Sequence, residues 1–134
     1  MRDGPTHKLK GSATNQDFSE FSAGWRAAIV ILSGGVEGSE HMLERPCISL
    51  GRGPGSDLSF DDDAMSRVHA ALEFAAGGFR IRDLGSTNGV RLNGGELEVG
   101  ELKNGDRFQL GRHLFQFLLE NRHREPKTYL LPEA

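Results

Sequence analysis

Cysteine and long apolar runs are what this chain of 134 residues most clearly lacks. The single cysteine, Cys47, excludes an intrachain disulfide and a cysteine zinc site, and we expect it to be a small core residue at a strand start. The longest apolar run, Ala27 to Leu32, is far too short to span a bilayer, and the first residues lack the apolar stretch of a signal peptide. The sequence therefore predicts a cytoplasmic protein.

An excess of positive charge is also missing. The formal net charge of −3 argues against a nonspecific binder of nucleic acid or anionic membranes, because such proteins need a cationic field. The five histidines show no metal-ligand spacing, so we expect neither a metal nor a cofactor. The length suits one domain with tails.

Glycine, in contrast, is abundant, with 18 residues, of which 15 lie between Gly34 and Gly111. Glycine in a helix interior costs about 1 kcal/mol relative to alanine, so long helices are not expected in this segment. Pairs such as Asn88-Gly89 and Asn104-Gly105 supply the positive φ angles that tight turns require. The segment is therefore predicted to consist of short strands and turns.

Short apolar or alternating segments between these turns predict an all-β fold, a two-sheet antiparallel β-sandwich. We expect residues 25–120 to form the domain, with flexible tails over residues 1–24 and 121–134. The predicted strands are Ala27 to Leu32, His41 to Glu44, Ile48 to Gly51, Val68 to Phe74, Phe79 to Asp83, Val90 to Leu92, Arg107 to Gly111 and His113 to Leu119.

Polar clusters interrupt the strands at three places, Gly51 to Asp57, Ser66 to His69 and Asp83 to Gly89. Together they contain two guanidinium groups, several hydroxyls, a side-chain amide and glycines that leave backbone N–H groups accessible. All of these donate hydrogen bonds, and arginine offers a planar fork to phosphate. The inventory suits a tetrahedral anion.

The same clusters resemble the forkhead-associated (FHA) domain. The resemblance rests on G-R at 51 to 52, S-R-V-H at 66 to 69, D-L-G-S-T-N-G-V at 83 to 90, L-N-G at 92 to 94 and L-K-N-G-D-R-F-Q-L-G at 102 to 111. It implies a β-sandwich whose loops at one end bind phosphothreonine in a partner protein, without catalysis. The resemblance thus predicts a small adaptor or regulator in Ser/Thr-kinase signalling, whose partners are kinase substrates or the kinase itself.

The resemblance also implies roles for single residues. Those in contact with the phosphopeptide would be Arg52 and Ser66 at the phosphate, Thr87 near it, Asn88 on the peptide main chain, and Arg67 as added charge or a peptide contact. Those that support the site would be Gly51, His69, Asp83, Ser86 and Gly89.

Two short segments near the predicted site need separate comment, the loop at Ser56 and the acidic run Asp61 to Asp63. Ser56 stands where many FHA domains have an asparagine, which leaves the rigidity of its loop open. Asp61-Asp62-Asp63 lacks the alternating spacing and distal glutamate of a calcium loop, so we expect a solvated loop that selects against acidic peptides.

Other functions compete with phosphothreonine binding. One is an FHA-fold interaction or scaffold domain that binds partners independently of phosphate. Another is a hydrolase that uses Ser66, His69 and Asp83, although the G-x-S-x-G elbow is absent. Gly51 to Gly55 is not followed by the G-K-[ST] of a nucleotide loop.

Thr14 is a predicted regulatory phosphorylation site. It precedes an acidic residue, Asp17, by three positions, a spacing that resembles one class of FHA ligand. Once phosphorylated, the tail could occupy the domain's own site or that of a neighbour, at high effective concentration. The alternative is an unremarkable disordered tail.

Overall fold

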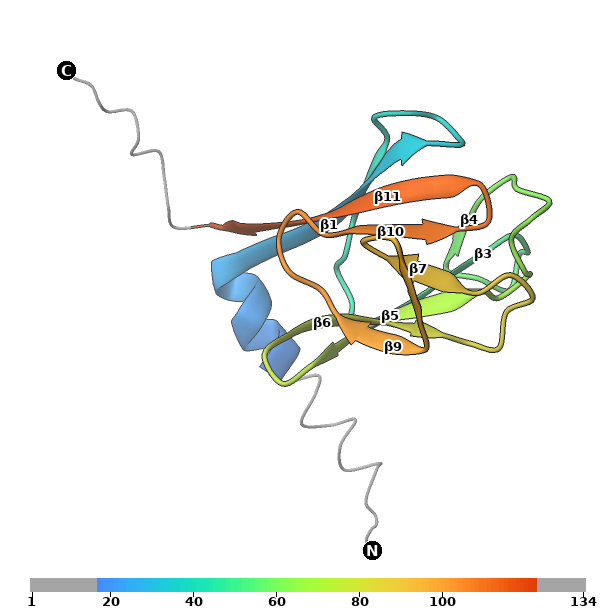
Figure 1. The fold of residues 1–134 in the computed structure, drawn as a ribbon. Coiled ribbons are helices and arrows are strands. Elements are labelled where there is room, and N and C mark those ends of the chain that lie inside the picture. Colours follow the sequence, from blue (N-terminus) through green and yellow to red (C-terminus); the bar gives the residue numbers. More distant parts are fainter. Residues whose placement is uncertain (1–16, 123–134) are drawn as a thin grey trace, which may run out of the picture.

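Two β-sheets face each other in the structure, a computed structural model that describes residues 17–122 (Figure 1). One sheet has the order β2-β1-β11-β10-β7-β8 and the other the order β4-β3-β5-β6-β9, which confirms the predicted β-sandwich. In chain order the strands are β1 (Trp25–Ser33), β2 (Glu40–Met42), β3 (Cys47–Gly51), β4 (Leu58–Ser59), β5 (Ala70–Ala75), β6 (Gly78–Asp83), β7 (Val90–Leu92), β8 (Gly95–Leu97), β9 (Val99–Glu101), β10 (Arg107–Leu110) and β11 (His113–Asn121).

Neighbouring strands pair in antiparallel fashion, with one short exception. β1 and β11 form the longest pair, in which Ile29 lies opposite Phe117. β3 and β4 are parallel, and their two residue pairs are Leu50 with Leu58 and Gly51 with Ser59. In the part of the chain that the structure describes, no helix is long and apolar enough to cross a membrane.

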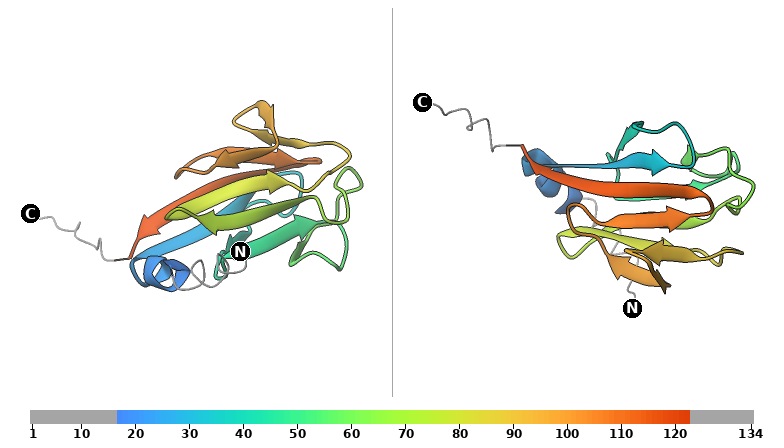
Figure 2. Two further views of the ribbon diagram at one scale, coloured as in Figure 1. Left: turned by 90° about the horizontal axis from the view of Figure 1, so that it is seen from below. Right: turned by 45° about the horizontal axis from the view of Figure 1, so that its top comes forward.

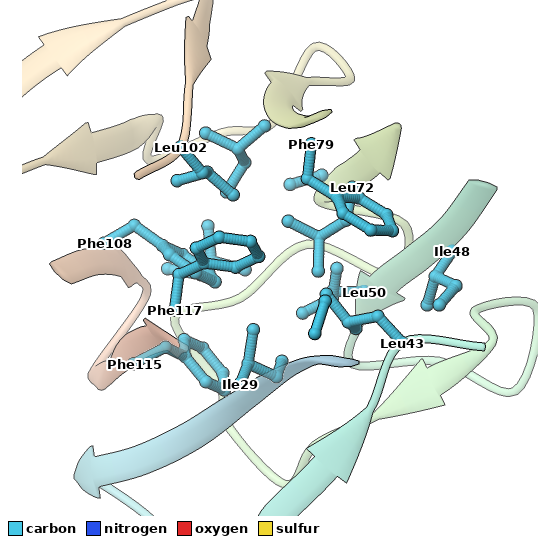
Figure 3. Close-up of a cluster of buried hydrophobic side chains, with 14 of the residues drawn as sticks. Ile29, Leu43, Ile48, Leu50, Leu72, Phe79, Leu102, Phe108, Phe115 and Phe117 are labelled. Atoms are coloured by element: carbon cyan, nitrogen blue, oxygen red, sulfur yellow. The ribbon is translucent and has the colours of Figure 1, made fainter. Parts of the chain in front are cut away.

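The core lies between the sheets and is formed by alternate residues of the strands. In β6, Phe79 and Ile81 are buried while Arg80 and Arg82 lie on the outer face, as the alternation predicts. Figure 3 shows the side chains of both sheets meeting, including Ile29, Leu50, Leu72, Phe108 and Phe117. The Phe108 and Phe115 rings are stacked with centroids 5.0 Å apart.

Cys47 is exposed, so its predicted place in the core is wrong. It begins β3, in which Ile48 and Leu50 are buried. Because side chains alternate along a strand, the residue before Ile48 lies on the outer face.

A short helix over residues 17–24 precedes β1 and packs on the core. Phe18 is only 7% exposed, and its ring contacts those of Phe74 and Phe79 at centroid distances of 5.4 and 6.1 Å. Phe21 lies 4.8 Å from Phe74. This helix differs from the flexible tail predicted over residues 1–24, because Phe18 and Phe21, three positions apart, lie on one face of its roughly two turns and pack on an apolar surface.

The two ends of the sandwich differ. β3 and β6 end, and β5 and β7 begin, at the end that carries the loops on the right of Figure 1. The helix lies at the opposite end, and both views of Figure 2 show the same separation. The three polar clusters of the sequence therefore share one end of the molecule.

Candidate functional site

Three loops meet at this end: the first loop (residues 52–57), the second loop (residues 60–69) and the third loop (residues 84–89). Backbone hydrogen bonds join the first two, since the Arg52 N–H donates to the Ser66 carbonyl at 2.9 Å and the Gly53 N–H donates to the Arg67 carbonyl at 3.1 Å. The Leu84 N–H donates to the His69 carbonyl at 3.0 Å, which joins the second loop to the third. The loops therefore form one connected surface.

Gly51 allows the first two loops to approach so closely. A Cβ atom at this position would overlap the carbonyl oxygen of Arg67, which belongs to the backbone and cannot rotate away. Only glycine fits this contact.

The Arg52 side chain is exposed, and one hydrogen bond at Nε fixes its guanidinium group. Its Nε–H donates to the Met65 carbonyl at 3.1 Å. The two Nη groups have no hydrogen-bond partner among residues 17–122. The guanidinium therefore presents its free edge as a preorganised donor pair for an anion.

Ser66 directly follows Met65, whose carbonyl holds the Arg52 side chain, and has its hydroxyl proton available. The Ser66 Oγ accepts a hydrogen bond from the Thr87 N–H at 3.0 Å. An oxygen that already accepts from the protein can still donate its own proton to a ligand. The same bond fixes Thr87, whose side chain is exposed, next to Ser66.

His69 is fully buried, and its ring hydrogen-bonds to the second loop and to the third. Its Nδ1 accepts a hydrogen bond from the Ser66 N–H at 3.0 Å, which requires that the proton of the neutral ring sit on Nε2. The Nε2–H then donates to the Gly89 carbonyl at 2.7 Å. The two hydrogen bonds thus join the backbones of the second and third loops, and the supporting role that the FHA resemblance implies for His69 stays a prediction.

The third loop is held from both sides. The Asn88 Nδ2 donates to the Ala64 carbonyl at 2.8 Å, so the exposed amide is tied to the second loop. Within the third loop, Asp83 Oδ1 accepts from the Ser86 N–H at 3.0 Å, and Ser86 Oγ accepts from the Gly89 N–H at 2.9 Å. Gly89 has φ +80°, a conformation that favours glycine.

Ser56 fixes the first loop, which answers the question that its sequence leaves open. Its Oγ donates to the Arg67 carbonyl at 2.6 Å. Next to it, the carboxylate of Asp57 accepts from the Ser49 N–H at 2.9 Å, and this hydrogen bond lowers the pKa of Asp57. Arg67 itself is exposed and forms no ion pair among the described residues, so its charge is available at the surface of the second loop.

The arrangement does not assemble a Ser-His-Asp triad. Both ring nitrogens of His69 are bonded to backbone groups, and Asp83 binds the Ser86 N–H instead of the imidazole. His69 therefore cannot take a proton from Ser66 as a general base.

Sequence reasoning missed the groups that anchor the two most important side chains. These groups are the carbonyls of Ala64 and Met65, and no pattern of side chains signals a backbone acceptor. The expected solvated loop at Asp61 to Asp63 is wrong at Asp62, which is only 4% exposed and hydrogen-bonds to His113. Within residues 17–122, no group of three or more His, Cys, Asp or Glu residues could hold a metal ion.

The model of the FHA domain family matches residues 48–111, which contain all three loops. Residues 48–111 therefore form an FHA domain. The FHA domain of the CT664 protein from Chlamydia trachomatis superposes on it with a TM-score of 0.65 and 28% sequence identity, over 69% of this chain and 96% of that one.

Two curated relatives of this chain have the names of a regulator and of an inhibitor. The glycogen accumulation regulator GarA of Mycolicibacterium smegmatis is 38% identical over 92 residues, which are 69% of this chain and 58% of that protein. The oxoglutarate dehydrogenase inhibitor of Corynebacterium efficiens is 35% identical over 92 residues, which are 69% of this chain and 65% of that protein. The chain thus spans less than two thirds of the length of either relative.

Proposed function

We propose that this FHA domain binds phosphothreonine peptides through the three loops and acts as a binding module instead of an enzyme. The observation that carries the proposal is that the free guanidinium edge of Arg52, held by the carbonyl of Met65, and the available hydroxyl of the next residue, Ser66, belong to one connected loop surface. In this proposal both contact the phosphate, Thr87 and Arg67 add donors and charge around it, and Asn88 holds the peptide main chain.

The chemistry of phosphate explains why such a site responds to a kinase. Phosphothreonine carries about −1.5 to −2 charges at pH 7, so it forms charge-assisted hydrogen bonds that unmodified threonine cannot form. Aspartate and glutamate have fewer oxygens and less charge, and they are poor substitutes. A few contacts to an extended peptide correspond to micromolar affinity, about −8 kcal/mol.

The names of the relatives support a regulatory role. GarA is a regulator and the corynebacterial protein is an inhibitor of oxoglutarate dehydrogenase. We propose by analogy that this chain is a small cytoplasmic regulator in Ser/Thr-kinase signalling, whose partners are the kinase or its phosphorylated substrates. The rival proposal is an FHA domain that binds its partners independently of phosphate.

Titration of an oriented threonine-peptide library, with and without phosphate, separates these proposals. We expect binding only with phosphate, and about tenfold or more weaker binding by Arg52→Ala, because a hydrogen bond to a charged group is lost. Arg107→Ala is the matched control, since Arg107 is an exposed arginine of β10 outside the three loops. Equal binding of both forms of the library would favour the phosphate-independent function, and an unaffected Arg52→Ala would contradict the assignment of the phosphate site.

Thr14 lies outside the described residues, and its role stays a proposal. We propose that its phosphorylation lets the N-terminal segment compete for the phosphothreonine site of this domain or of a neighbouring molecule. The phosphorylated protein should then bind an external phosphopeptide more weakly than the unmodified protein does. Equal binding by the two forms would overturn this proposal.

A further inference from the structure

Asp62 lies buried beneath the candidate site and uses both oxygens of its carboxylate. Oδ2 accepts hydrogen bonds from His113 Nδ1 at 2.8 Å and from the Arg112 N–H at 2.7 Å. Oδ1 accepts from the Ala64 N–H at 2.8 Å. Because Arg112 and His113 belong to the turn before β11 and its first residue, the carboxylate joins one sheet to the second loop, which leads into the other.

The turn that begins at Asp62 carries the anchors of two binding side chains. The Met65 N–H donates to the Asp62 carbonyl at 3.0 Å, which closes the turn. The carbonyl of Ala64 holds Asn88 at 2.8 Å, and the carbonyl of Met65 holds Arg52 at 3.1 Å. A shift of this turn would therefore move both side chains together.

His113 is the side-chain donor that fixes the carboxylate. Its imidazole is 2% exposed and stacks on Phe115 at a centroid distance of 5.7 Å, with Phe60 at 5.3 Å on another side. Burial opposes ionisation of Asp62, but the hydrogen bonds from His113 and from two backbone N–H groups outweigh it and lower the pKa of Asp62. The carboxylate is thus the acceptor, and the Nδ1–H of His113 donates to it.

We propose that Asp62 and His113 are positioning residues that set the affinity of the phosphopeptide site. The buried pair holds the turn at residues 62–65, and the turn holds Arg52 and Asn88 in the geometry that binds the ligand. Neither residue touches the peptide. The inference rests on the proposed phosphopeptide binding, but the part of it that says the pair holds the turn, Arg52 and Asn88 in place can be tested in the free protein.

Two substitutions of His113 separate the donor from the ring. His113→Phe keeps an aromatic ring against Phe60 and Phe115 but removes the donor, and it leaves a buried carboxylate with one bond fewer. His113→Asn loses the ring but keeps an N–H close to the position of Nδ1. If the pair positions the site, His113→Asn, which keeps the N–H donor, should retain phosphopeptide affinity and His113→Phe should lose it. If His113 serves only to pack the core, His113→Phe, which keeps the ring, should retain affinity and His113→Asn should lose it.

Calorimetric titration with one phosphothreonine peptide measures this difference. We expect His113→Phe to bind about tenfold more weakly, because the turn that holds Arg52 and Asn88 loses its hydrogen bond from His113 to the Asp62 carboxylate and must be ordered again when the peptide binds, whereas His113→Asn binds within about twofold of the parent despite a lower unfolding midpoint. Phe74→Leu, a core change at the opposite end, controls for loss of stability and should bind as the parent does. Equal affinity of His113→Phe and the parent would overturn the proposal.

A spectroscopic readout tests the same inference without a ligand. The NMR signal of the Arg52 Nε–H reports its hydrogen bond to the Met65 carbonyl in the free protein. We expect this signal to shift and to exchange faster with solvent in His113→Phe and in Asp62→Asn, but not in Phe74→Leu. An unchanged signal in both site variants would refute the positioning role even if the parent binds no phosphopeptide, so failure of this inference and failure of the proposed function are distinguishable.

Discussion

At the scale of single residues, the candidate site depends on which atoms of a polar side chain the protein itself uses. Arg52 donates to the Met65 carbonyl through Nε, so its Nη groups stay available to a ligand. Ser66 Oγ accepts from the Thr87 N–H, so its hydroxyl proton also stays available. The sequence motifs predicted which residues meet, because they identify side chains. They could not predict the anchors at Ala64 and Met65, since those are backbone carbonyls of residues with apolar side chains.

Gly51 offers a test at this scale. Gly51→Ala places a Cβ against the backbone oxygen of Arg67, so the two loops must separate, and we expect a loss of about 1 to 3 kcal/mol in the free energy of unfolding. Phosphopeptide affinity should fall as well, because Arg52 follows directly.

Urea unfolding measures the first effect, with Gly78→Ala as the control. A Cβ at Gly78 would meet nothing within 4 Å, so this variant should be as stable as the parent. A Gly51→Ala protein of parental stability would show that the loops adapt.

At the scale of secondary-structure elements, length and apolar content together decided what could be predicted. β1 and β11 have nine residues each, and their apolar pattern predicts them directly. β7 has only three residues and was still predicted, because Val90 and Leu92 alternate with Arg91. The strands β4, β8 and β9 are as short or shorter and have one apolar residue each, so they show no alternation to be recognised. The helix over residues 17–24 was missed because its stability comes from contact with Phe74 and Phe79, which are far away in the sequence.

Phe18→Ala tests whether this helix belongs to the domain. Removal of a buried phenylalanine ring costs about 3 kcal/mol or more, so the urea midpoint should fall clearly, whereas Ser19→Ala, an exposed change in the same helix, should have little effect. Phosphopeptide affinity should stay unchanged because the helix lies at the opposite end. A midpoint equal to that of Ser19→Ala would show that the helix contributes nothing to the core.

At the scale of the whole molecule, carboxylates link its stability to pH. Folding lowers the pKa of Asp62 and of Asp57, so the ionised form of each stabilises the folded state. This contribution is complete above the pKa of the unfolded chain, near 4, and is lost as the pH falls through the lower pKa of the folded state.

Urea unfolding over a series of acidic pH values measures this dependence. We expect the free energy of unfolding to fall below about pH 4, with a shallower fall in Asp62→Asn, which is less stable than the parent at pH 7 but has lost one titrating group. If the free energy of unfolding of Asp62→Asn fell as steeply with acid as that of the parent, the lowered pKa of Asp62 would be contradicted.

The position of the helix also limits where Thr14 can go. Asp17 lines a hollow together with Ala76 and Gly77, in the turn between β5 and β6, and the six residues of β5, about 20 Å, separate that turn from the loops. Thr14 is three residues from Asp17, and an extended chain carries it roughly 10 Å at most.

With the helix in place, the proposed phosphate on Thr14 would have to cross most of the length of β5 to reach the domain's own Arg52, whereas the loops of a neighbouring molecule carry no such constraint. Such a contact joins one end of a protomer to the opposite end of the next. Unless it closes into a ring, a head-to-tail contact of this kind propagates from one molecule to the next, so the proposed phosphorylation of Thr14 would favour rings or filaments of domains.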